Sequence, residues 1–141
     1  MPNGHVALAD AVRPGGRGWV AAAVVLVVLV GVVSLLPPRG TPGGDIADLG
    51  EVRATLGHAA AYAVLGFAFA MSVRVPRGES VPPRIFIAIV VILTGYGALL
   101  EVLQGAFSAR SFQWVDVLAN AVGASVGAGA ALLIRRRSLA G

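Results

Sequence analysis

The chain contains no cysteine, and only 13% of its 141 residues are charged, about half the fraction found in soluble domains. Without cysteine it can form no disulfide bond and offers no thiolate to a metal ion. The low charge and the 57% of hydrophobic residues exclude an ordinary water-soluble domain. The basic residues are all arginines, and the net charge is +4. In a membrane protein an excess of basic residues usually sets the orientation of the chain in the membrane, so we predict no nucleic-acid partner.

The apolar residues form four long runs, each long enough to cross a bilayer as an α-helix. The first run is longer than a signal-peptide core and has no small-residue cleavage pattern, so we interpret it as an uncleaved anchor. Prolines and glycines follow it, and we predict a linker in water over 37–55. The sequence therefore predicts an all-α integral membrane four-helix bundle. Its spans are about 19–36, 56–73, 85–107 and 112–134, between an N-terminal tail (1–18) and a basic tail (135–141).

The arginines that flank the spans are unequally divided between the two membrane faces. One face, shared by both termini, has Arg13, Arg17, Arg74, Arg77, Arg84, Arg135, Arg136 and Arg137, and the other has Arg39, Arg53 and Arg110. By the positive-inside rule we predict cytoplasmic termini in the cell membrane. The linker 37–55 and the short loop 108–111 are then outside. The run Arg135 to Arg137 is interpreted as an orientation signal.

Polar residues within the spans are few and lie near the predicted outer ends. His58 begins the second span, Glu101 and Gln104 end the third, and Asp116 and Asn120 begin the fourth. An ionisable side chain at membrane depth costs about 2.5 to 3.5 kcal/mol, so it indicates a function. Helical spacing places the polar residues of each span on one face. We predict that these faces meet around an outward-facing polar pocket.

Two further residues complete the predicted pocket. Tyr62 is one helical turn after His58, and Arg110 lies in the loop 108–111, within reach of both carboxylates. The predicted binding residues are His58, Tyr62, Glu101, Gln104, Arg110, Asp116 and Asn120. The alternative is that these groups only hold the helices together, through ion pairs with Arg110 and amide hydrogen bonds.

The chemistry of the cluster is left open by the sequence. His58, Glu101 and Asp116 are candidate catalytic residues for acid–base chemistry. A histidine with two carboxylates is also a donor set for a divalent metal. Since no local ligand spacing supports such a site, we predict neither metal nor cofactor. Gly123 and Gly127 have the spacing of small residues at close helix contacts, and we predict that they pack against another helix.

The order of these motifs resembles the VanZ-like family of small bacterial membrane proteins. The segments are HAAAYAVLG from His58, EVLQGAFSAR from Glu101 and DVLANAVGASVG from Asp116. The resemblance covers roughly 56–127 and implies a helical protein of the bacterial cytoplasmic membrane and cell envelope, in a family whose namesake is associated with resistance to the glycopeptide teicoplanin. The family usually has an Asp-Lys pair just before the motif histidine, whereas Ala54 and Thr55 stand here.

Three functions follow from the sequence as hypotheses. The first is a membrane protein whose outward-facing pocket binds an envelope lipid, a glycan precursor or a glycopeptide-like drug. The second is a membrane-embedded enzyme that acts on a lipid-linked substrate at the same residues. The third is a structural or accessory subunit that packs on a membrane protein partner. In each case membrane lipids surround the chain.

Overall fold

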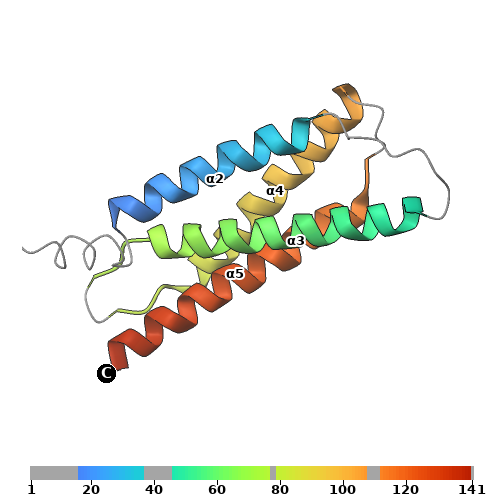
Figure 1. The fold of residues 1–141 in the computed structure, drawn as a ribbon. Helices are drawn as coiled ribbons and strands as arrows, with labels where there is room; N and C mark the ends of the chain where they lie inside the picture. Colours follow the sequence, from blue (N-terminus) through green and yellow to red (C-terminus); the bar gives the residue numbers. More distant parts are fainter. Residues whose placement is uncertain (1–15, 37–45, 77–78, 108–111, 141) are drawn as a thin grey trace, which may run out of the picture.

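The computed structural model describes residues 16–36, 46–76, 79–107 and 112–140. They form four helices, labelled as in Figure 1: α2 (Arg17–Leu35), α3 (Ile46–Ser72), α4 (Pro83–Phe107) and α5 (Trp114–Ala140). No strand occurs in these ranges, so the predicted all-α class is confirmed. Each helix contains a stretch that is long and apolar enough to cross a membrane.

Two helices extend beyond the spans predicted from the sequence. α3 begins at Ile46, so the predicted linker over 37–55 is wrong for its second half. The prolines of that segment end at Pro42, and the residues from Ile46 onward include Ala, Leu, Glu and Arg, which favour helix. α5 continues through the three arginines to Ala140. The segment predicted as a basic tail is therefore helical over 135–140.

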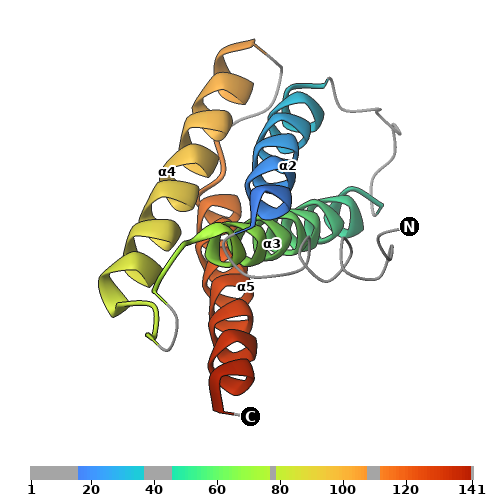
Figure 2. The same ribbon diagram turned by 90° about the vertical axis from the view of Figure 1, so that its left-hand side faces the viewer.

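The centre of the fold is a close crossing of α3 and α5, which is visible in Figures 1 and 2. The helices touch backbone to backbone because the residues at the crossing are small. A Cβ atom added at Gly123 would overlap the carbonyl oxygen of Ala59, and one at Gly127 would overlap that of Ala63. Gly66 of α3 meets the backbone of Ala124 in the same way. Side chains of α3 and α5 near this crossing are thereby brought within hydrogen-bonding distance.

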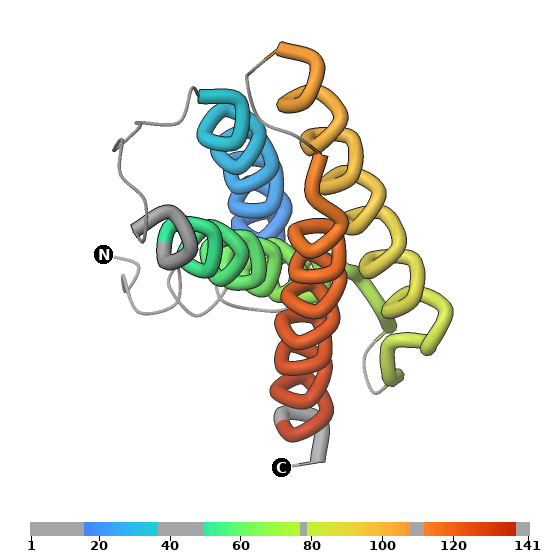
Figure 3. The backbone as a smooth tube through the Cα atoms, turned by 90° about the vertical axis from the view of Figure 1, so that its right-hand side faces the viewer, coloured from blue at the N-terminus to red at the C-terminus, as the bar shows by residue number. Residues whose placement is uncertain are grey.

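Helices α4 and α2 lie against this pair, as the tube view in Figure 3 also shows. Leu93 of α4 and Leu65 of α3 are buried in the shared apolar core. α2 is anchored to α4 by the Tyr96 hydroxyl, which donates a 2.7 Å hydrogen bond to the carbonyl oxygen of Val27. Most large apolar side chains of α2 are exposed. Exposed apolar side chains of this kind suit contact with lipid tails, which are themselves apolar.

Arg135 joins the end of α5 to the end of α3. Its side chain is buried, and Nη1 donates hydrogen bonds of 2.7 Å to the carbonyl oxygen of Ala70 and 2.8 Å to that of Val73. The last carbonyls of a helix lack partners within the helix, and a cation stabilises them. Arg135 therefore has a structural role in addition to the orientation role predicted from the sequence. Arg136 and Arg137 are exposed.

Candidate functional site

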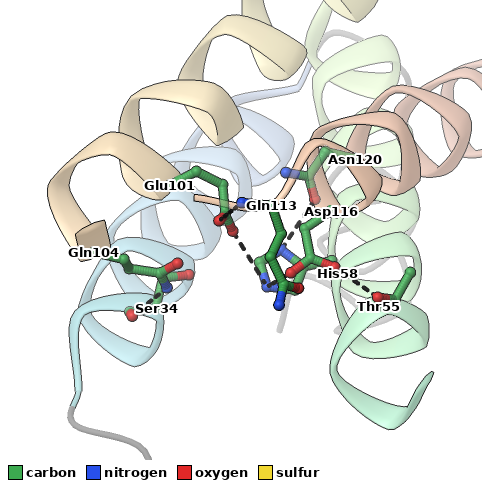
Figure 4. A network of polar contacts seen from close by, with 8 residues as sticks. All are labelled: Ser34, Thr55, His58, Glu101, Gln104, Gln113, Asp116 and Asn120. Carbon is green, nitrogen blue, oxygen red and sulfur yellow. Dashed lines mark hydrogen bonds and ion pairs between the residues drawn. The ribbon is translucent and has the colours of Figure 1, made fainter. Parts of the chain in front are cut away.

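Three titratable side chains from three helices meet near the crossing of α3 and α5. They are His58 of α3, Glu101 of α4 and Asp116 of α5 (Figure 4). His58 Nε2 lies 3.9 Å from Glu101 Oε1 and 3.9 Å from Asp116 Oδ2, and the three residues offer one possible ligand atom each within 4.8 Å of one another. Both carboxylate side chains are at most 3% exposed, whereas His58 is 16% exposed. The cluster is thus buried, and His58 is its most accessible member.

Asn120 fixes the orientation of the imidazole ring. Its Oδ1 lies 3.2 Å from His58 Nδ1. An amide oxygen can only accept a hydrogen bond, so with the amide in this orientation the contact requires a proton on Nδ1. Nε2, the other ring nitrogen, then faces the two carboxylates. Asn120 is one helical turn after Asp116, so α5 supplies both a carboxylate and the group that orients the histidine.

Each carboxylate is held by its outer oxygen. The Thr55 hydroxyl donates a 2.7 Å hydrogen bond to Asp116 Oδ1, and the backbone N–H of Gln113 lies 3.4 Å from Glu101 Oε2. Within the described residues, the inner oxygens, Glu101 Oε1 and Asp116 Oδ2, have no hydrogen-bond partner. The two atoms that face His58 are therefore the two that are left unsatisfied, although an unpaired buried acceptor is costly.

Tyr62 and Asn120 close one side of the cluster against α4. A Cβ atom added at Gly97 would lie 2.9 Å from the Tyr62 hydroxyl oxygen and would overlap Asn120 Nδ2. In the described part of the chain neither of these two polar atoms has a hydrogen-bond partner. Gly97 is thus the residue that lets α4 approach both side chains, and it allows Glu101, one turn later, to reach His58.

The structure separates one of the predicted residues, Gln104, from this cluster. Gln104 Nε2 donates a hydrogen bond to the carbonyl oxygen of Ser34 in α2, and Figure 4 shows it directed toward that helix. Arg110 lies outside the described residues, so its predicted pairing with Glu101 or Asp116 stays a prediction. Of the residues that are described, His58 is the basic side chain that contacts both carboxylates.

Sequence reasoning missed two contributors to the site. Thr55 was assigned to the linker, yet it is three residues before His58, and this spacing places both on one face of a helix. Gln113 contributes through its backbone N–H, which no residue type reveals. The outward-facing pocket predicted from the sequence stays a prediction, and the described side chains form a buried cluster with His58 partly exposed at its edge.

Four helices that are long and apolar enough to cross a membrane, with a buried polar cluster between three of them, are the features of a helical membrane protein. Residues 19–135 match the VanZ/LLP1 family. The chain therefore belongs to the VanZ/LLP1 family, as the motifs around His58, Glu101 and Asp116 predicted. The matched residues include the greater part of each of the four helices. Searches of curated proteins and of solved structures find no match.

Proposed function

We propose that the chain binds the polar part of an envelope lipid or glycan precursor at His58, Glu101 and Asp116. The observation that carries this proposal is the pair of buried carboxylate oxygens that face His58 without a hydrogen-bond donor. Hydroxyl and amine groups of a sugar or a headgroup are donors of the kind these oxygens lack. Unsatisfied polar groups are selected against in a packed bundle unless a function needs them.

Access to the cluster supports a headgroup more than a bulky ligand. His58 is partly exposed, while Asp116 and Asn120 are fully buried. A hydroxyl or amine on a flexible headgroup can reach Nε2 and the inner oxygens from that edge. A glycopeptide-like drug, the ligand suggested by the family's namesake, would contact the cluster through one of its own sugar groups in the same way.

The orientation in the membrane belongs to this proposal. With cytoplasmic termini, the N-terminal half of α3, which contains Thr55 and His58, faces outward, toward envelope precursors. The chain has no cysteine, so single cysteines can be introduced without background labelling. Gly50 and Ser80 are exposed at opposite ends of the bundle, and a Cβ atom at Gly50 meets no other atom. In intact cells an impermeant maleimide should label Gly50→Cys and spare Ser80→Cys. The reverse pattern would refute the orientation.

The ligand proposal is tested by identifying lipids that remain bound. Purified wild-type protein in mild detergent should retain an envelope lipid or lipid-linked glycan detectable by mass spectrometry. Glu101→Gln should lose it, because the substitution removes an anionic acceptor while keeping the shape of the side chain. Glu51→Gln is the matched control, since Glu51 is an exposed carboxylate on α3 outside the cluster. Equal retention by all three proteins would contradict the proposal.

A second candidate function is catalysis on the same lipid-linked substrate. It is favoured by the arrangement of His58, whose Nδ1 is oriented by Asn120 while Nε2 faces two carboxylates. A base that is oriented by a third group is the usual arrangement for proton transfer. Chemical conversion of the retained lipid by purified protein, lost in His58→Ala, would establish catalysis. Retention without conversion would leave the binding function.

The accessory-subunit hypothesis loses one of its supports in the structure. It relied on a small-residue surface of the fourth helix that a partner could cover. Gly123 and Gly127 are instead covered by α3 of the same chain. The backbone of α3 therefore occupies the surface of α5 that a partner protein would need.

A further inference from the structure

We infer that His58 Nε2, Glu101 Oε1 and Asp116 Oδ2 form a binding site for a divalent transition-metal ion such as Zn²⁺ or Mn²⁺. The sequence offered no local ligand spacing for such a site, because each ligand comes from a different helix. The fold supplies what the spacing lacked, since it brings one atom of each residue within 4.8 Å of the other two. This inference concerns the same three atoms as the proposed lipid site, and its test uses no lipid.

The geometry of the three atoms fits an ion between them. His58 Nε2 lies 3.9 Å from one oxygen of each carboxylate, and the three residues offer ligand atoms that all lie within 4.8 Å of one another. One ion can bridge atoms about 4 Å apart with bonds of roughly 2.0 to 2.2 Å, which is the range of metal–nitrogen and metal–oxygen bonds. One imidazole with two carboxylates is a donor set suited to Zn²⁺ and Mn²⁺.

Each of the three proposed metal ligands has a hydrogen-bond partner that holds its side chain in place. Asn120 holds His58 at Nδ1 and thereby directs Nε2 inward. Thr55 holds Asp116 at Oδ1, and the Gln113 N–H holds Glu101 at Oε2. In metalloproteins the ligating side chains are oriented by such outer contacts. Every ligand here is fixed through its outer atom, and both carboxylates keep an inner oxygen without a donor.

An ion would resolve the electrostatic problem of the buried cluster. Two carboxylates that are at most 3% exposed face one imidazole, and the described residues place no arginine beside them. Buried charges are generally paired or bound to a metal. Three protein ligands would also leave a coordination position open, as in catalytic metal sites. A phosphate or hydroxyl of a headgroup could occupy that position.

The test uses metal ions alone, with the full-length protein in detergent. After treatment with a chelator, the protein is titrated with Zn²⁺ or Mn²⁺ by calorimetry, and retained metal is counted by mass spectrometry. We expect about one tightly held ion per chain and a rise in melting temperature on addition of metal. Glu101→Gln and Asp116→Asn should lose both effects, whereas Glu51→Gln should keep them. Equal metal binding by wild type and Glu101→Gln would overturn the site.

Thr55 provides a second test that leaves all three ligands in place. Thr55→Val removes the hydroxyl that holds Asp116 while it keeps the shape of the side chain, and Thr55→Ser keeps the hydroxyl. We expect Thr55→Val to weaken metal binding about 10- to 100-fold and Thr55→Ser to restore it. Circular dichroism and gel filtration establish that each variant is folded. Unchanged affinity in folded Thr55→Val would refute the positioning role and with it the proposed ligand arrangement. Since no lipid is used, failure here leaves the lipid-retention result independent.

Discussion

Gly127→Leu is expected to prevent assembly of the four-helix fold. A Cβ atom at this position already overlaps the backbone carbonyl of Ala63 in α3, and backbone cannot move aside as a side chain does. Overpacking a close helix contact should cost about 3 kcal/mol or more. Gly123→Leu should behave in the same way, because its obstacle is the backbone of Ala59. The measurement is the fraction of monodisperse, helical protein recovered by size-exclusion chromatography in detergent.

Gly129 offers a control on the same helix. An added Cβ atom there meets no other atom, so Gly129→Leu makes the same chemical change while leaving the crossing intact. It should assemble like wild type, and replacement of a helical glycine should even favour the helix slightly. Gly127→Ala should be intermediate, since it adds only the overlapping methyl group. If Gly127→Leu and Gly129→Leu assemble equally well, α3 and α5 do not cross as described.

The helices could be predicted from the sequence because a membrane requires long apolar segments. Each of the four runs became a helix, since backbone groups in lipid must be satisfied within the segment. What the runs could not show is how far each helix continues beyond its apolar run. Ile46 to Thr55 and the residues after Ile134 are helical without being strongly apolar. Helix propensity favours the first segment, and the hydrogen bonds of Arg135 support the second. Neither feature can be recognised from a run of apolar residues.

The site was partly predictable for a related reason. Polar residues in spans are rare, and helical spacing showed which of them share a face, so His58, Glu101, Asp116 and Asn120 could be grouped. Helical spacing does not tell which neighbouring helix a face meets. Gln104 shares a face with Glu101, yet its partner is the carbonyl oxygen of Ser34 in α2. Backbone donors such as that of Gln113 are also invisible in a sequence, because every residue except proline has one.

Neutralising one buried acid is expected to abolish function while it leaves the fold at least as stable. Glu101 and Asp116 are buried, and each has an inner oxygen that accepts no hydrogen bond within the described residues. In protein from which metal has been removed by a chelator, two uncompensated charges cost folding energy. Glu101→Gln or Asp116→Asn should therefore raise the free energy of unfolding by about 1 kcal/mol or leave it unchanged. Both variants should lose retained lipid and metal.

Gln104 gives the contrasting result that separates a functional cluster from one that only joins helices. Gln104→Ala removes a hydrogen bond to α2, so it should lower the free energy of unfolding by about 1 kcal/mol and leave metal binding near the wild-type value. The two classes of variant then move stability and function in opposite directions, as residues kept for activity at the expense of stability do. Thermal melts and ligand retention are measured on the same preparations. If Glu101→Gln and Asp116→Asn destabilise the chelated protein as much as Gln104→Ala does, with ligand retention intact, the cluster serves packing and the functional proposal is wrong.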